Sequence, residues 1–119
     1  NVRIEDEPLS AAMDRMEKAC LGILSEVEQH PEKAAQVRRF ANYYVQDAVK
    51  ILTLYAELEE KGVQGENAAG VRAEVAQNAQ TIATAFENQL DSLFARDALD
   101  ISTDLEVLNG MLKGQGLVD

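Results

Sequence analysis

The spacing of apolar residues between helix-breaking positions is the feature that most constrains this chain. Proline occurs only at Pro8 and Pro31, so the chain after Pro31 holds no residue that forbids a helix interior. From Leu9 onward, apolar side chains return in alternating steps of four and three, as one face of an α-helix requires. No stretch alternates apolar and polar residues for long, as a half-buried strand would. The sequence therefore predicts an all-α fold.

This spacing predicts three long antiparallel helices that form a bundle, plus a short C-terminal helix. We expect the long helices over residues 9–29, 31–61 and 67–96, with the only clear loop at residues 62–66. The 119 residues suit one domain, residues 1–119, and we expect it to be part of a longer protein. The expected apolar stripes are Leu9, Met13, Met16, Cys20, Ile23 and Val27; Val37, Ala41, Tyr44, Ala48, Ile51, Tyr55 and Leu58; Val71, Val75, Ile82, Phe86, Leu90 and Leu93; and Ile101, Leu105, Leu108 and Leu112.

The short fourth helix leads to the sharpest structural expectations. Thr103 followed by Glu106 fits a capping box at its start. A helix this short does not persist alone in water, so we expect it to fold back onto the bundle and to cover Phe94 and Leu99 at the turn. Inside the bundle, we expect Ile51 to be buried between the first and third helices.

Charge excludes several classes of partner. The formal net charge is −10, from 11 basic and 21 acidic residues. Nucleic-acid binding requires clustered cations, and anionic lipid repels an acidic surface, so we expect neither nucleic acid nor direct membrane binding by this segment. Cys20 is alone, so no intrachain disulfide can form. We expect a protein partner instead, because long helices, sparse aromatic residues and the absence of a catalytic motif favour an interaction module.

No catalytic, cofactor or metal site can be assigned from the residues. His30, the only histidine, sits at an expected turn, where an exposed role is the ordinary one. The spacing of the acidic residues near position 100 fits no EF-hand, and no nucleophile-elbow, phosphate-loop or zinc-protease motif occurs. We expect that acidic group to face outward as a partner-docking surface, the alternative being a cap that only seals the core. Its members are Asp97, Asp100, Asp104 and Glu106.

Two segments resemble one known family. The stretch from Phe86 to Leu117, FENQLDSLFARDALDISTDLEVLNGMLKGQGL, is similar to the C-terminal signature of the XpaC-like family, the bromo-chloro-indolyl phosphate hydrolysis proteins. The stretch from Phe40 to Leu58, FANYYVQDAVKILTLYAEL, resembles its central helix. The resemblance implies a bacterial protein whose full form carries membrane segments upstream, with this part in the cytoplasm. It also implies an association with toxic-anion-resistance proteins of the TelA type.

Three functions remain open at this point. The first, which we favour, is a non-enzymatic helical module that docks a partner protein, linked through the resemblance to toxic-anion resistance. The second is a phosphate-ester hydrolase acting on indolyl phosphate-type substrates, as the family name suggests, although no catalytic motif is visible. The third is a self-associating coiled coil, because the apolar stripe of the second helix is wide enough for one side to stay uncovered and to pair with another copy of the chain.

Overall fold

The computed structural model describes residues 7–119, and over that range the chain is helical without strands, which confirms the all-α prediction. α1 begins close to the expected position and ends where Pro31 predicts. The bounds are α1 (Glu7–Gln29), the 3₁₀ turn η1 (Pro31–Lys33), α2 (Ala34–Arg39), the π turn η2 (Phe40–Tyr44), α3 (Val45–Glu60), α4 (Glu66–Ser92) and α5 (Ala95–Gly114).

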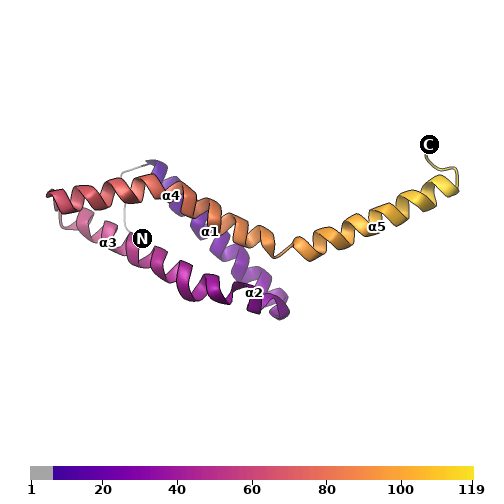
Figure 1. The fold of residues 1–119 in the computed structure, drawn as a ribbon, viewed down its shortest axis with the longest axis horizontal. Coiled ribbons are helices and arrows are strands. Elements are labelled where there is room, and N and C mark those ends of the chain that lie inside the picture. Colours follow the sequence, from indigo (N-terminus) through magenta and orange to yellow (C-terminus); the bar gives the residue numbers. More distant parts are fainter. Residues whose placement is uncertain (1–6) are drawn as a thin grey trace.

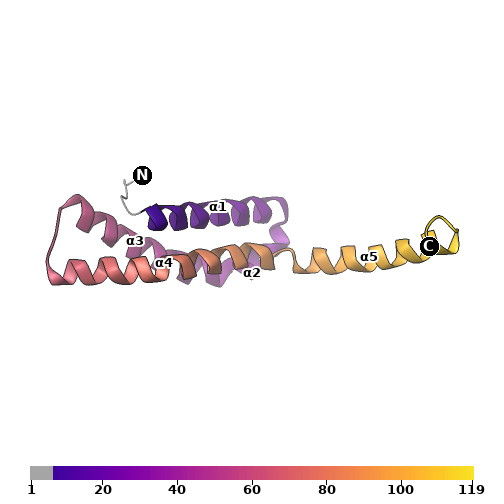
Figure 2. The same ribbon diagram turned by 90° about the horizontal axis from the view of Figure 1, so that it is seen from above.

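The first three predicted helices lie side by side, and we call residues 7–93 the body. The chain runs along α1, returns through α2, η2 and α3, and runs forward again through α4 (Figures 1 and 2). Within the body, each of the three helical stretches therefore runs opposite to the one before it, while α1 and α4 run in the same direction. The reversal between α3 and α4 comes after Lys61, where Gly62 adopts a φ of 64° that suits glycine best.

The core lies mainly between α1 and α4. Small side chains on both helices allow their backbones to come close, and Phe40 closes the core by packing edge-on against Phe86 at 4.8 Å between ring centroids. Gly22 marks a close approach, because a Cβ there would lie 2.8 Å from a Leu90 methyl group. The buried apolar residues of the cluster are Leu9, Ala12, Met16, Ala19, Ile23, Val37, Phe40, Ala48, Tyr55, Val75, Ala79, Ala83, Phe86 and Leu93.

A polar seam borders this core on the same two helices. The Arg15 guanidinium donates two hydrogen bonds to Glu87, at 3.0 and 2.5 Å, one to Gln80 Oε1 at 2.7 Å and one to Thr84 Oγ1 at 3.1 Å. The hydrogen bonds from Arg15 hold the pKa of the Glu87 carboxyl below its ordinary value. This set of bonds fixes the register between α1 and α4.

The second predicted helix is continuous, but its winding changes in the middle, at the π turn η2. The π turn η2 makes the buried face step by five residues, from Phe40 to the half-buried Val45, instead of four or three. The predicted stripe is therefore wrong at three positions on exposed surface: Ala41, Tyr44 and Ile51, the last with 41% of its surface exposed. After η2, Ala48 and Tyr55 are the buried residues of α3.

The third predicted helix ends earlier than expected. α4 stops at Ser92, not near residue 96, because the amides of Leu93 and Phe94 turn back onto the carbonyls of Leu90 and Asp91, at 3.1 and 3.0 Å. The Ser92 hydroxyl supports this turn by donating to the Gln89 carbonyl at 2.6 Å. The two-residue break separates α4 from α5.

The prediction for the C-terminal helix is wrong in length and in position. α5 has 20 residues and no buried residue, and it points away from the body instead of folding back (Figure 1). Thr103 lies inside α5, where its hydroxyl donates to the Leu99 carbonyl at 3.1 Å, so it caps nothing. Phe94 and Leu99 are exposed, contrary to expectation. With α5 extended, the molecule measures 73 × 31 × 20 Å.

From residue 7 onward, no helix combines the length and apolar character that crossing a bilayer demands.

Candidate functional site: an apolar groove beside α3

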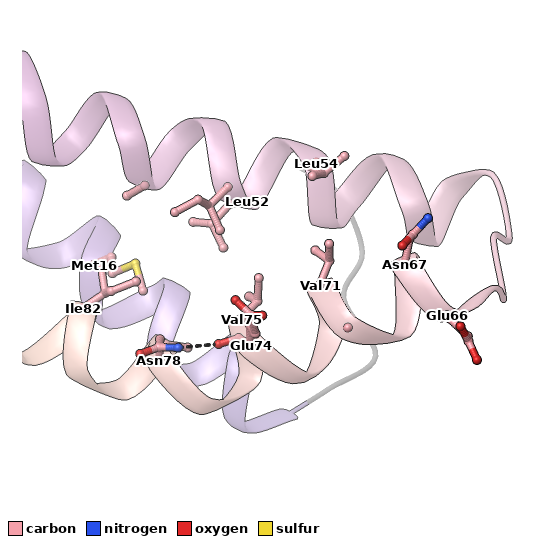
Figure 3. A pocket seen from close by; sticks show the side chains of 14 residues that line it. Met16, Leu52, Leu54, Glu66, Asn67, Val71, Glu74, Val75, Asn78 and Ile82 are labelled. Atoms are coloured by element: carbon pink, nitrogen blue, oxygen red, sulfur yellow. Dashed lines mark hydrogen bonds between the residues drawn. The ribbon is translucent and has the colours of Figure 1, made fainter.

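An elongated hollow of about 630 Å³ runs between α3 and α4, and its inner end reaches α1 at Met16. In Figure 3, Leu52 projects from α3 into this groove, while Val71 and Val75 face it from α4. Its lining residues are Met16, Ala48, Ile51, Leu52, Leu54, Glu66, Asn67, Gly70, Val71, Glu74, Val75, Asn78, Ala79 and Ile82. We call this feature the α3–α4 groove.

The groove is open because the facing surfaces do not fill it. The change of winding at η2 leaves Ile51 half-turned to solvent, and Leu54 beside it is also exposed. On the other side, α4 offers small residues, Gly70 and Ala79, where larger ones would meet α3. Apolar side chains left uncovered in this way are typical of a surface that receives another molecule.

The polar groups at the groove are carboxylates and amides. Glu66, Asn67, Glu74 and Asn78 belong to the lining, and Asn78 Nδ2 donates to the Glu74 carbonyl within α4 at 2.8 Å (Figure 3). No lysine, arginine or histidine belongs to the lining. The groove therefore suits an apolar ligand surface with positive flanks, and it repels a phosphate ester.

At the open end of the groove, hydrogen bonds from Arg72 connect α3 to α4. Arg72 donates Nε–H to the Glu59 carboxylate, and its Nη2 donates to the carbonyls of Val63, at 2.6 Å, and Leu58, at 3.4 Å. These bonds tie the end of α3, the loop and the start of α4 together. Arg72 was not predicted from the sequence, since no local pattern reveals contacts across a loop.

A second hollow, of about 370 Å³, lies between α3 and α1 and shares Met16, Ala48 and Leu52 with the first. It includes Met13, Cys20, Val45 and Phe86. Burial raises the pKa of the Cys20 thiol, so the thiol stays protonated and is a poor nucleophile at neutral pH. The two hollows therefore border α3 on the sides that face α4 and α1.

The predicted acidic group is divided by the structure. Asp97 accepts a hydrogen bond from Lys33 Nζ at 3.0 Å, and the same ammonium bonds Glu26 at 2.5 Å and lies 4.9 Å from the centre of the Phe94 ring. Asp100 and Asp104 lie on exposed α5 near the side that carries Asp97. Glu106, two residues after Asp104, faces away from it.

Lys33 is the residue that sequence reasoning missed at this junction. Only 8% of its surface is exposed, and its hydrogen bond with Glu26 raises the pKa of the ammonium, with Asp97 adding to the effect. Lys33 thus joins α1, η1 and the first turn of α5. By contrast, His30 is exposed, as expected, and lies 3.9 Å from Glu26 and 3.7 Å from Glu32.

Among the residues from 7 to 119, no three histidine, cysteine, aspartate or glutamate side chains are grouped as metal binding would require.

A family model described as 5-bromo-4-chloroindolyl phosphate hydrolysis protein matches residues 2–108. The chain belongs to this family. The match covers the whole body and most of α5, so the family's characteristic sequence includes both the groove and the exposed helix. No curated protein and no solved structure matches the chain significantly.

Proposed function

We propose that this chain is a non-enzymatic helical protein-interaction module, and that its α3–α4 groove receives an amphipathic helix of a partner protein. The observation that carries the proposal is the uncovered apolar lining of the groove, with Ile51 and Leu54 exposed along one edge. A helix laid into such a groove buries apolar side chains from successive turns on both surfaces.

Charge defines the chemistry of the partner helix. The groove contributes Glu66 and Glu74 and no cation, and the chain as a whole carries a net charge of −10. A partner helix with lysine or arginine beside its apolar face complements this surface, whereas an acidic helix is repelled. Salt should weaken the complex, because exposed charge pairs are screened.

The partner that we propose is a TelA-type toxic-anion-resistance protein, and we place the complex in the cytoplasm. The support for both is the family resemblance of the segments at Phe40–Leu58 and Phe86–Leu117. The acidic residues of α5 stay part of this proposal as a second, peripheral contact for a basic partner.

A matched pair of substitutions tests the groove. Leu54 lines the groove and is 44% exposed, while Leu24 on α1 is 55% exposed and lines neither hollow. Binding of the purified TelA-type protein of the same bacterium should weaken at least about tenfold in Leu54→Lys, since a buried unpaired charge costs more than one decade of affinity. Leu24→Lys adds the same charge elsewhere and should bind like the parent. Equal affinities for the parent and Leu54→Lys would remove the groove from the proposal.

The hydrolase alternative is favoured by the family's description and is tested separately. Purified protein is incubated with 5-bromo-4-chloroindolyl phosphate, with and without Mg²⁺, Mn²⁺ and Zn²⁺. We expect no turnover above that of a heat-inactivated sample, because neither hollow is lined by a cation that would hold the phosphate. Metal-dependent turnover that Asp100→Asn or Asp104→Asn abolishes would establish the alternative.

A further inference from the structure

The exposed helix α5 carries a narrow and regular apolar stripe. Its members are spaced in steps of three, four, three and four, which place one residue on the same side at every turn. We call this stripe the α5 seam: Ala98, Ile101, Leu105, Leu108 and Leu112. The same spacing forms the a and d positions of a coiled coil, in which two helices with such seams interlock along their length.

The junction with the body sets the direction of α5. Lys33, itself buried, bonds Asp97 in the first turn of α5 and lies over the ring of Phe94 just before it. Beyond this junction, the exposed seam residues Ile101, Leu105 and Leu108 meet no part of the body. The helix therefore projects with its seam uncovered, and pairing needs no rearrangement of the body.

The residues beside the seam indicate what covers it. Asp97 and Asp104 lie along one edge, each immediately before a seam residue, and Ser102 and Asn109 lie along the other edge, each immediately after one. Two parallel copies of α5 bring unlike edges together, so each aspartate faces a serine or an asparagine that can donate a hydrogen bond. A fully overlapping antiparallel pair brings like edges together and sets Asp104 against Asp104.

We propose that the α5 seam binds the α5 seam of a second copy of this chain, in parallel orientation, as a two-stranded coiled coil. The proposal is independent of the α3–α4 groove, which remains uncovered in the pair. It moves the self-association considered for the second helix onto α5, where the structure leaves Ala98, Ile101, Leu105 and Leu108 exposed and Leu112 half-buried.

Sedimentation equilibrium tests the pairing with a matched pair of variants. Leu105 belongs to the seam and is 51% exposed, whereas Val107 lies off the seam and is 60% exposed. The parent protein and Val107→Glu should reach twice the monomer mass between micromolar and near-millimolar concentration. Leu105→Glu should raise the dissociation constant at least about tenfold, because it places two carboxylates in an apolar layer. Circular dichroism should show that both variants remain helical.

Disulfide formation tests the orientation. In a Cys20→Ala background, Leu105→Cys faces itself across a parallel pair and should form a covalent dimer on oxidation, whereas Val107→Cys should not. A parent protein that stays monomeric at every concentration overturns the proposal. Its radius of gyration from small-angle scattering then shows whether α5 still projects, with a radius like that of the extended structure, or packs against the body, with a smaller radius. Dimers that resist Leu105→Glu, or that cross-link only between Ile101→Cys and Leu105→Cys chains, also overturn it. None of these results depends on whether the groove binds its partner.

Discussion

At the scale of single residues, Lys33 stands out because its charged side chain is almost completely buried. Its ammonium is removed from water and is compensated by Glu26 and Asp97. Removing a buried cation leaves its carboxylate partner buried and unpaired, which costs far more than the loss of an exposed pair. Lys33 therefore supports both the α1 end of the body and the root of α5.

Replacing Lys33 should test this role directly. Lys33→Met should lower the urea midpoint of unfolding clearly, while Lys61→Met, which removes an exposed pair with Glu57, should change it little. Because the folded state raises the pKa of Lys33, its contribution is complete below the ordinary lysine pKa of about 10.4 and is lost as pH rises through the raised value. Above about pH 10, the parent protein should therefore lose stability as Lys33 is deprotonated, and Lys33→Met should lack that part of the loss.

Gly22 and Gly70 make a second comparison at this scale. A side chain at Gly22 meets Leu90, so Gly22→Val should destabilise the body by about 1–3 kcal/mol through overpacking. Nothing lies within 4 Å of a Cβ at Gly70, so Gly70→Ala should stabilise α4 by about 0.5–1 kcal/mol, the usual gain in a helix interior. Urea unfolding measures both, and a stabilising Gly22→Val would show that α1 and α4 are not in close contact.

At the scale of elements, the sequence predicted helix positions better than helix faces. Pro31 and Gly62 mark real ends, because they act through their own backbone. The π turn at Phe40–Tyr44 rotates the faces of α3, and no residue type in that segment announces it, so Ile51 was placed in the core although it is exposed. The groove beside α3 is a consequence of this rotation, which is why the sequence did not reveal it.

α5 shows a different limit of sequence reasoning. Its apolar stripe was identified correctly, yet the stripe alone does not say whether its cover comes from the same chain or from another. The fold-back prediction assumed the first, because a lone helix of this length is marginal in water. The break at Leu93 and Phe94 and the salt bridge from Lys33 to Asp97 direct α5 outward instead.

The acidic residues of α5 lead to a prediction at the element scale. Asp97 is unsuitable for a charge-reversal test of docking, because it bonds Lys33. Asp100 and Glu106 are exposed and lie off the seam, so Asp100→Lys with Glu106→Lys should change the free energy of unfolding by less than about 0.5 kcal/mol. If these carboxylates contact a basic partner, the same double variant should bind the TelA-type protein more weakly. Unchanged binding would limit docking to the groove.

At the scale of the whole molecule, the extended shape is measurable in solution. The radius of gyration is 20.8 Å, whereas a compact chain of 100 residues has about 13 Å. Small-angle scattering of the monomeric Leu105→Glu variant should therefore give a radius close to 20.8 Å. A value near that of a compact chain would show that α5 packs against the body in solution, as the apolar stripe alone predicts.

The two-residue break between α4 and α5 has a further consequence. It allows α5, about 30 Å long at 1.5 Å per residue, to act as a stalk that joins two bodies while leaving both grooves accessible. A pair of chains is then bivalent. A partner that presents two basic helices at a matching spacing would gain avidity from the second contact without any new interface, since that contact forms at a high effective concentration.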